Sequence, residues 1–430
     1  MLTHDENMLL CRVQGDAPMG ALMRRHWVPA LLSEEVRERD GKPVRVRLFG
    51  EDLVAFRDTD GRVGLIDEYC PHRRASLVYG RNEDCGLRCL YHGWKIDAGG
   101  NVLEMFSEPT GSDLKNKIRH TAYPTHEAGG FVWAYMGPPE TMPGFVPPPF
   151  VQDDAPTVSI VKIRIPANWA QITEGQIDSA HSSSLHSSDM KPARVKGAEA
   201  DDKAWYRPST DKAPRLQVQT TPYGFHYAAI RRPIHQGGTH DYVRVTRYVA
   251  PFISLIPPNN LYNVAAVVVP IDDENSMFHF LAWGGDDCPD TDTWRDFCRA
   301  MPGKDLAPDW SPLRTRANDF GQDRAAMAEG SFTGIDGIPN QDIAMWVGMG
   351  PIVDRTREVL GGSDVAIVAF RRLMVDAAAR MRDGGEALGR TADTPAQQSL
   401  ASFEGVIEKE ADWRNCQRRV SAGAEPTLTR

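Results

Sequence analysis

Short hydrophobic runs separated by polar turn residues fill the first third of the chain. Runs of this length rich in β-branched, aliphatic and aromatic residues are typical of strands, and pairs such as Asp60-Gly61 and Gly99-Gly100 favour tight turns. The pattern therefore predicts a small antiparallel β domain near the N-terminus. Its clearest strand-like runs are 44–49, 53–56, 63–66 and 130–135.

A cluster of prolines separates this region from the rest of the chain. Six prolines fall between residues 138 and 149, and proline neither donates to a β ladder nor fits a helix interior. We therefore expect an N-terminal domain with a short helical segment at 1–140, a linker at 141–155 and a larger domain at 156–385.

The larger domain combines both periodicities. Helices are expected over Trp169–His181, from Trp294 onward and over Gln341–Ala378, and residues 386–430 are expected to form a tail or a packing helix near Leu400–Trp413. Mixed patterns of this kind predict an α+β fold with an antiparallel sheet and helices. Strand-like segments occur at 216–220, 224–230, 242–250, 261–269 and 277–283.

Composition narrows the class of protein. The 430 residues are 41% hydrophobic and 25% charged, and the formal net charge is -9. A negative balance argues against nucleic acid or an anionic membrane as a general partner. The N-terminus lacks the pattern of a secretory signal, and the longest apolar run, 264–269, is much shorter than the roughly 20 residues that span a bilayer. We expect a cytoplasmic protein.

The seven cysteines are too sparse for a disulfide scaffold. Two of them stand in the segments Cys70-Pro-His72 and Cys89-Leu-Tyr-His92, so each loop supplies one thiolate and one imidazole. A structural zinc site is the alternative, but zinc sites usually group a cysteine pair and then a histidine pair. A mixed-ligand 2Fe-2S cluster needs two thiolates on one iron and two imidazoles on the other. The remaining cysteines are expected to be free thiols: Cys11, Cys85, Cys288, Cys298 and Cys416.

A second group of potential ligands follows the linker in the order Asp178-x2-His181-x4-His186. Glu174, Asp178 and His181 would share one face of a helix, and the serines after His181 can unwind the chain and turn His186 back toward the same point. Two histidines and one carboxylate form the facial set with which iron(II) oxygenases keep coordination positions open. Spacing alone leaves three carboxylates possible: Asp336, Asp342 and Asp354.

Together these motifs resemble those of the α subunits of Rieske non-heme iron aromatic-ring oxygenases. Asn340-Gln-Asp342, followed by the segment 349–356, is similar to the phthalate dioxygenase subgroup. The resemblance implies an antiparallel β Rieske domain followed by a helix-grip catalytic domain. It implies a 2Fe-2S cluster held by Cys70 and Cys89 on one iron and by His72 and His92 on the other, and a mononuclear iron held by His181, His186 and Asp342.

Asp178 has a separate role by the same resemblance. A carboxylate that accepts N–H bonds from two imidazoles fixes their tautomers and raises their basicity. The resemblance implies that Asp178 bridges His181 to a cluster histidine, expected to be His92, of a neighbouring subunit. The expected assembly is a head-to-tail homotrimer, which can stack into a hexamer.

Two arginines are candidates for substrate binding. The resemblance implies that Arg207 and Arg244 clamp the carboxylates of an aromatic diacid, since guanidinium groups bind carboxylates bidentately. A surface charge or an internal ion pair is the alternative for each. Arg244 shares a strand face with Tyr242, Thr246 and Tyr248, but parity does not tell which face lines a cavity.

The resemblance implies addition of both atoms of O2 to phthalate, giving a cis-4,5-dihydrodiol. Electrons from NAD(P)H would arrive through a separate flavin and iron-sulfur reductase, because this sequence has no Gly-rich dinucleotide fingerprint. Isophthalate, a halobenzoate or phenoxybenzoate remains possible as the substrate, and a monooxygenase or O-demethylase would use the same metal sites. A Rieske electron-transfer or ligand-binding protein and a metal-stabilised structural protein are the alternatives from other classes.

Overall fold

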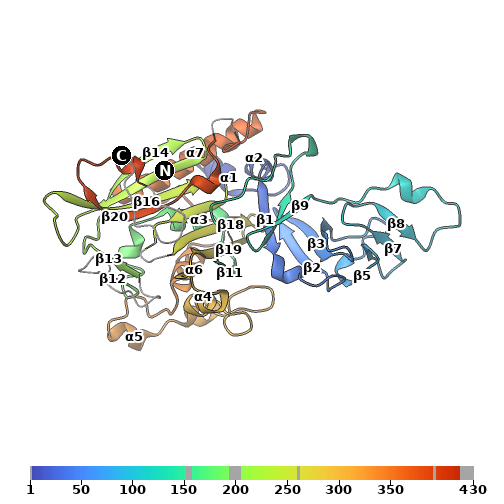
Figure 1. Ribbon diagram of the computed structural model, residues 1–430, viewed down its shortest axis with the longest axis horizontal. Helices are drawn as coiled ribbons and strands as arrows, with labels where there is room; N and C mark the ends of the chain where they lie inside the picture. The colour runs from blue at the N-terminus through green and yellow to red at the C-terminus, as the bar shows by residue number, and fades with distance from the viewer. Residues whose placement is uncertain (1, 152–156, 193–204, 259–261, 391–393, 417–430) are drawn as a thin grey trace. The chain divides into compact units, whose positions relative to one another are not determined.

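The computed structural model describes residues 2–151, 157–192, 205–258, 262–390 and 394–416. The chain divides into two compact units, one formed by residues 13–145 and the other by residues 1–12 together with 146–430 (Figure 1). The division falls inside the proline-rich segment. Residues 152–155 of the expected linker and residues 391–393 and 417–430 of the expected tail lie outside the described residues.

The smaller unit is built from short antiparallel strands. They are β1 (Trp27–Leu32), β2 (Val44–Leu48), β3 (Glu51–Arg57), β4 (Val63–Asp67), β5 (Arg81–Glu83), β6 (Gly86–Arg88), β7 (Trp94–Ile96), β8 (Val102–Met105), β9 (Thr125–Ala128) and β10 (Phe131–Tyr135), preceded by helix α2 (Pro18–Arg24). Their sheets have the orders β1-β10-β9, β2-β3-β4 and β5-β6-β7-β8. The predicted antiparallel β domain is confirmed.

The β2–β3 hairpin illustrates how local chemistry builds this unit. Leu48 pairs with Glu51, so only Phe49 and Gly50 form the turn. Both have positive φ, 50° and 83°, which is the two-residue turn whose twist matches the flanking strands. A Cβ on Gly50 would lie 2.6 Å from the Gln14 side chain, so both backbone conformation and space require glycine here.

The larger unit contains one antiparallel sheet in the order β11-β19-β18-β17-β16-β15-β14, with β20 also paired to β16. The strands are β11 (Thr157–Ile165), β14 (Arg215–Thr221), β15 (Gly224–Arg231), β16 (His240–Val249), β17 (Ile253–Ile256), β18 (Asn263–Pro270), β19 (Ser276–Gly284) and β20 (Phe403–Glu408). A short parallel pair joins β12 (Met190–Pro192) to β13 (Trp205–Arg207).

The larger unit contains the helices α1 (His4–Cys11), α3 (Trp169–Ile177), α4 (Thr291–Phe297), α5 (Arg324–Ala328), α6 (Ile338–Gly348) and α7 (Val365–Arg382). Three of them pack against the sheet. Helix α3 contacts β17 and β18, α7 contacts β14 and β15, and α4 contacts β11. The combination of antiparallel sheet and helices is the α+β arrangement expected from the sequence. No helix among the described residues is long and apolar enough to cross a membrane.

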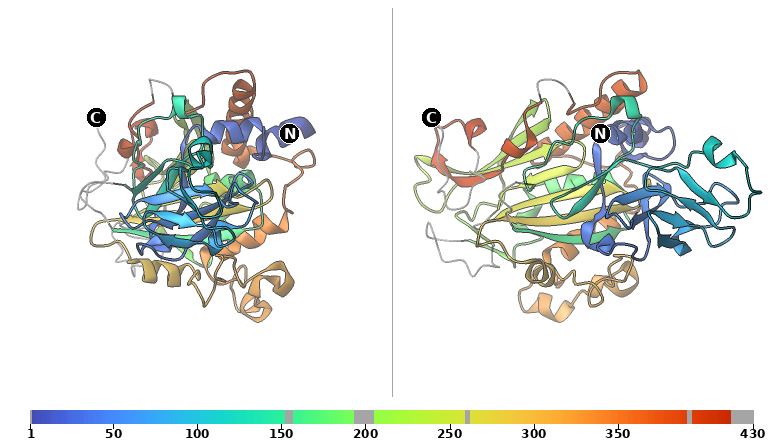
Figure 2. Two further views of the ribbon diagram at one scale, coloured as in Figure 1. Left: turned by 90° about the vertical axis from the view of Figure 1, so that its right-hand side faces the viewer. Right: turned by 45° about the vertical axis from the view of Figure 1, so that its right-hand side comes forward.

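The first helix belongs to the larger unit, which the sequence pattern did not indicate. Helix α1 lies beside α7, and Figure 2 shows the two in blue and orange next to each other. Asn7 donates to the carbonyl of Val353 and accepts a hydrogen bond from buried Arg355. These polar contacts are made by residues almost 350 positions apart in the chain, so no local pattern could predict them.

A buried ion cluster joins α3 to α7 and to the segment that follows α6. The guanidinium groups of Arg355 and Arg371 both contact the carboxylate of Glu174, at 2.9 and 2.8 Å. Burial raises the pKa of Glu174, but the two positive charges outweigh burial and hold the pKa below its usual value. Glu174 is therefore bound to arginines and does not face the histidines as its helical spacing suggested.

Three local expectations were wrong. Helix α3 ends at Ile177, before His181, because Asp178 is extended and its Oδ1 accepts a hydrogen bond from the amide of Ala180. The pattern over Gln341–Ala378 is two helices, since α6 ends at Gly348 and α7 begins at Val365.

The third expectation concerns the C-terminal segment, for which a packing helix was one possibility. The segment instead forms strand β20. Strand β17 pairs with β16 only at 247–249, whereas β20 pairs with β16 at 240–245. The free edge of β16 thus offers β20 a ladder of backbone hydrogen bonds. Buried Phe403 and Ile407 are four residues apart, which is also a helical spacing, so periodicity could not distinguish the two.

Candidate metal centres and substrate cavity

Two tight turns in the smaller unit carry the Cys-x-His and Cys-x2-His segments. The amide of Arg74 donates to the carbonyl of Cys70, and the amide of Gly93 donates to the carbonyl of Cys89. Each turn therefore starts at a cysteine and carries a histidine. The thiols are almost fully buried, at 1% and 3% exposure, and the imidazole rings of His72 and His92 lie 4.4 Å apart by their centroids.

The surroundings of these four side chains fit a mixed-ligand iron-sulfur cluster. Nδ1 of His72 is buried and has no hydrogen-bond partner in the described part of the chain, and its ring stacks on Trp94 at 4.7 Å. Burial raises the pKa of the Cys70 thiol to about 11, while the amides of His72 and Arg73 point at the sulfur and oppose this shift. A bound metal ion favours the thiolate strongly enough to reverse such a shift.

A second group of potential ligand atoms comes together in the larger unit. Nε2 of His181 and Nε2 of His186 are 3.1 Å apart, and Oδ1 of Asp342 is 3.5 Å from the first and 3.2 Å from the second. Two imidazole nitrogens and one carboxylate oxygen thus point to one place. The donor set matches the facial arrangement of non-heme iron(II).

The chain between the two histidines turns back through its serines. Residues His181–Ser183 form a 3-10 turn, and the Ser182 hydroxyl donates to the carbonyl of Ser179. The amide of Leu185 donates to the carbonyl of His181, and the amide of Met190 to that of His186. This compact series of turns brings His186 beside His181, as the serine-rich spacer predicts.

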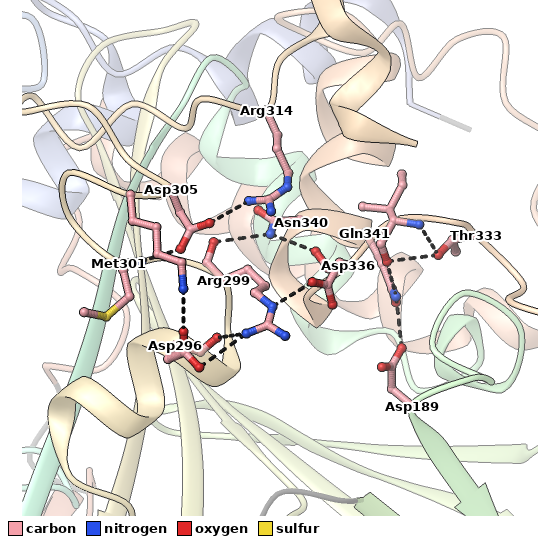
Figure 3. A network of polar contacts seen from close by, with 12 residues as sticks. Asp189, Asp296, Arg299, Met301, Asp305, Arg314, Thr333, Asp336, Asn340 and Gln341 are labelled. Carbon is pink, nitrogen blue, oxygen red and sulfur yellow. Dashed lines mark hydrogen bonds and ion pairs between the residues drawn. The ribbon is translucent and has the colours of Figure 1, made fainter. Parts of the chain in front are cut away.

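Helix α6 positions the carboxylate. It starts after Gly337, whose φ is 86°, and the Asn340 side chain donates to the carbonyls of Asp336 and Arg299 (Figure 3). The other two possible carboxylates have different partners. Asp336 is paired with Arg299 at 2.7 Å, and Asp354 accepts hydrogen bonds from Thr356.

Asp178 lies beside this centre. Its Oδ2 is 3.5 Å from Nδ1 of His181, and a quarter of its side chain is exposed. Burial raises the pKa of Asp178, but the hydrogen bond and charge of His181 outweigh burial and lower it. Burial by itself would lower the pKa of His181. The carboxylates of Asp178 and Asp342 outweigh burial, so the pKa of His181 is raised. The field of the two carboxylates therefore favours a cation at this place.

A cavity opens next to the convergent ligands. Arg244 and Thr246 line it from β16, so the face that carries Arg244 is the face toward the cavity. Nη2 of Arg244 donates to the carbonyl of Pro257 at 2.8 Å. Its Nε and Nη1 are buried and have no partner among the described residues. Apolar groups complete the walls, among them Tyr227, Ile256, Phe278, Phe280 and Ile338.

Two further buried arginines stand behind this wall. Arg207 donates to the Ser183 hydroxyl and the Ser182 carbonyl, at 3.1 and 3.0 Å, and the cavity wall at this point is formed by Ser182. Arg231, which the sequence did not single out, donates to the Ser179 carbonyl at 2.7 Å. Burial and the charge of Arg244 lower the pKa of Arg231 to about 10.

Comparison with known proteins gives the class to which these sites belong. Residues 26–116 match the Rieske [2Fe-2S] domain and residues 134–428 match the LigXa C-terminal domain like family. The chain belongs to the Rieske oxygenases, as an oxygenase subunit with a LigXa-like C-terminal domain. The cofactors of such an oxidoreductase are a Rieske 2Fe-2S cluster and a mononuclear iron, and its co-substrate is O2.

Several curated relatives cover nearly the whole chain. The chain is 62% identical to the phthalate 4,5-dioxygenase oxygenase subunit of Pseudomonas putida, over 97% of this chain and 95% of the relative. It is 38% identical to the 3-chlorobenzoate-3,4-dioxygenase oxygenase subunit of Comamonas testosteroni, over 87% and 88%. It is 32% identical to the 5,5'-dehydrodivanillate O-demethylase oxygenase subunit of a Sphingobium species, over 96% and 91%.

Solved structures share the fold. The terminal oxygenase of carbazole 1,9a-dioxygenase from Novosphingobium sp. KA1 has a TM-score of 0.54 at 22% identity, covering 84% of this chain and 95% of that one. Dicamba monooxygenase bound to dicamba has a TM-score of 0.53 at 16% identity, covering 84% and 98%. The expected Rieske oxygenase fold is therefore confirmed.

Proposed function

We propose that this chain is the oxygenase component of a phthalate-type dioxygenase, which adds both atoms of O2 to phthalate and forms a cis-4,5-dihydrodiol. The observation that carries the proposal is the cavity in which Arg244 lies beside His181, His186 and Asp342, with two guanidinium nitrogens that have no partner in the described parts of the chain. The 62% identity to a phthalate 4,5-dioxygenase subunit supports it.

The proposed metal ligands follow from the two convergent sites. We propose that Cys70, His72, Cys89 and His92 bind the Rieske cluster, and that His181, His186 and Asp342 bind the mononuclear iron. When bound, the iron activates O2 and the cluster supplies electrons one at a time. The protein's own contribution is to orient the imidazoles and to exclude water with the apolar walls of the cavity.

The proposed substrate site uses the arginines in two ways. A carboxylate facing the Nη1–Nη2 edge of Arg244 would accept from Nη1 and from the second N–H of Nη2, in a bidentate, charge-assisted contact, while the open Nε lies on the other side of the guanidinium. Arg207 lies behind the wall and donates to Ser182 and Ser183, and we propose that its positive charge, acting across this wall, completes the site for a second carboxylate. The aromatic ring then lies against the apolar wall that contains Phe278 and Phe280.

We further propose that Asp178 bridges His181 to the His92 of a second copy of the chain. The two copies would belong to a homotrimer, and two such trimers could stack into a hexamer. The exposed quarter of its side chain leaves room for a second imidazole. Large apolar side chains around His92 support a contact surface there, because Leu90, Tyr91 and Phe106 are 62%, 56% and 67% exposed.

The electron source is proposed to be a separate flavin and iron-sulfur reductase that uses NAD(P)H. An oxygenase of the same fold has been solved with ferredoxin, in carbazole 1,9a-dioxygenase, which supports an external iron-sulfur donor. The cytoplasmic location expected from the sequence stays a prediction.

Product analysis tests the proposal. The purified protein is reduced and exposed to O2 with phthalate, isophthalate, terephthalate and 3-chlorobenzoate in parallel, and products are identified by mass and retention. A cis-dihydrodiol from phthalate with both oxygens from 18O2 supports the proposal. Turnover of another arylcarboxylate alone, or incorporation of one oxygen atom in place of two, would replace it with the corresponding activity.

A further inference from the structure

Gln341 lies directly before Asp342 on α6, and its side chain is 2% exposed. Its Oε1 is 2.7 Å from Nδ1 of His186. Its Nε2 donates to Oδ2 of Asp189 at 3.0 Å and to the carbonyl of Ile335 at 2.9 Å. Figure 3 shows Gln341 reaching toward Asp189. Sequence reasoning did not single out either residue, although Gln341 stands inside the Asn340-Gln-Asp342 motif.

These three contacts determine which way the amide faces. A carboxylate oxygen and a backbone carbonyl only accept hydrogen bonds, so the group between Asp189 and Ile335 must be the NH2 of Gln341. The reversed amide would place its oxygen against two other oxygens. The side-chain oxygen of Gln341 therefore faces His186 and accepts a hydrogen bond. The donor is Nδ1 of His186, so Nδ1 must carry a proton.

We propose that Gln341 is a positioning residue that fixes the tautomer and the ring orientation of His186, so that its Nε2 is presented as a metal ligand beside His181 and Asp342. A proton on Nδ1 leaves the lone pair on Nε2, and Nε2 is the atom that lies 3.2 Å from Oδ1 of Asp342. This inference rests on the proposed ligand set of the mononuclear iron.

Gln341 is itself held rigidly. The Ile335 carbonyl accepts a hydrogen bond from the Thr333 hydroxyl, and the Ile335 amide donates to that same hydroxyl. The preceding residue, Asn340, ties the start of α6 to Asp336 and Arg299. The consecutive residues Asn340, Gln341 and Asp342 therefore anchor the helix, orient one histidine and supply the carboxylate, respectively.

The two histidines then differ in what supports them. His181 faces the carboxylate of Asp178, whereas His186 faces the oxygen of a neutral amide. A carboxylate partner raises the basicity of an imidazole more than an amide does. Gln341 thus orients His186 without placing a further negative charge in contact with it.

The test is Gln341→Met, which keeps the side-chain length and removes the acceptor. Gln171→Met is a matched control, because Gln171 is equally buried at 2% exposure and donates to the carbonyls of Trp346 and Gly350 at the other end of α6, but contacts neither histidine. The mononuclear iron is removed from the intact oxygenase, and iron(II) affinity is measured against a competing chelator while the visible spectrum monitors the cluster.

We expect Gln341→Met to weaken iron(II) binding by roughly 10–100-fold, as removal of such supporting groups does in other metal sites, and Gln171→Met to leave it unchanged. In the cobalt(II)-substituted protein, the ring N–H protons of both ligand histidines give paramagnetically shifted, exchangeable proton resonances. Gln341→Met should lose one of these resonances through solvent exchange, and Gln171→Met should keep both.

A variant at Asp189 separates orientation from general damage. Asp189→Ala removes one of the two acceptors behind the Gln341 amide but leaves the Ile335 carbonyl, so Oε1 still faces His186 and iron(II) affinity should exceed that of Gln341→Met. The proposal is overturned if Gln341→Met binds iron(II) like the wild type and keeps both resonances, or if Asp189→Ala is as weak as Gln341→Met. Retention of iron by Asp342→Ala would instead refute the ligand set itself.

Discussion

Arg244→Met is expected to weaken the binding of phthalate and, at the same time, to stabilise the protein without substrate. The Arg244 side chain is 6% exposed, and its Nε and Nη1 have no partner among the described residues. A buried donor without a partner costs about 1–3 kcal/mol. A group kept at such a cost at the wall of a cavity is typical of a site built for a ligand, where function opposes stability.

The magnitude follows from the bonds gained and lost. Two charge-assisted hydrogen bonds to a carboxylate, at about 1.5 kcal/mol each, give roughly 3 kcal/mol, which is a loss of about 100-fold in affinity for phthalate. In the free protein, Met removes two unpartnered donors but also the bond to the Pro257 carbonyl. The net change should raise the free energy of unfolding by roughly 1 kcal/mol.

Arg247→Met is the matched control on the same strand. Arg247 is equally buried at 6% exposure, but parity places it on the opposite face of β16. Its guanidinium is fully engaged with Ala401, Tyr223, His226 and Cys416. This variant should lower stability and leave phthalate affinity unchanged.

Equilibrium binding of phthalate by calorimetry and denaturant unfolding without phthalate measure the two effects. Two results would refute the reasoning about Arg244. One is an affinity of Arg244→Met within error of the wild-type value. The other is a loss of stability as large as that of Arg247→Met, which would indicate that Arg244 has a structural partner.

The other predictions concern the metal sites and pH. Asp342→Ala should lose the mononuclear iron and keep the Rieske spectrum, measured by iron content and spin resonance; loss of both centres, or of neither, would contradict the ligand set. Asp178→Asn should keep both metals but slow single-turnover oxidation of the reduced cluster, and unchanged rates would refute the bridge. Burial and the charge of Lys162 lower the pKa of His279 from 6.5 to about 3. Between these values the unfolded chain binds a proton that the folded chain does not, so stability should fall as pH decreases through this window. His279→Leu should flatten this dependence in denaturant unfolding at pH 7 and pH 5, and an unchanged slope would contradict it.

Four strands of the smaller unit were predictable because their evidence is local. Val44–Leu48 alternates hydrophobic and polar residues, Phe131–Tyr135 is a short run of aromatic and aliphatic residues, and turn residues flank both. Helix α3 was expected to reach His181 but ends four residues earlier, at Ile177. The spacing of Asp178 and His181 also suits a helix, and periodicity does not show the hydrogen bond from the Ala180 amide to Asp178 that ends the helix.

The amino-acid sequence by itself determined the ligand types of both candidate metal centres and the class of chemistry they serve. Cys70 with His72, Cys89 with His92, and His181 with His186 are each separated by a few residues, so a single turn can bring the members of each pair together. Only the tertiary structure brought Asp342 to the two histidines, placed Arg244 at the cavity wall, and set Gln341 and Asp189 behind His186. Asp342 and Gln341 lie about 150 residues from the histidines that they contact. The position of Arg244 depends on which face of its strand is covered. Packing decides both, and local periodicity does not record it.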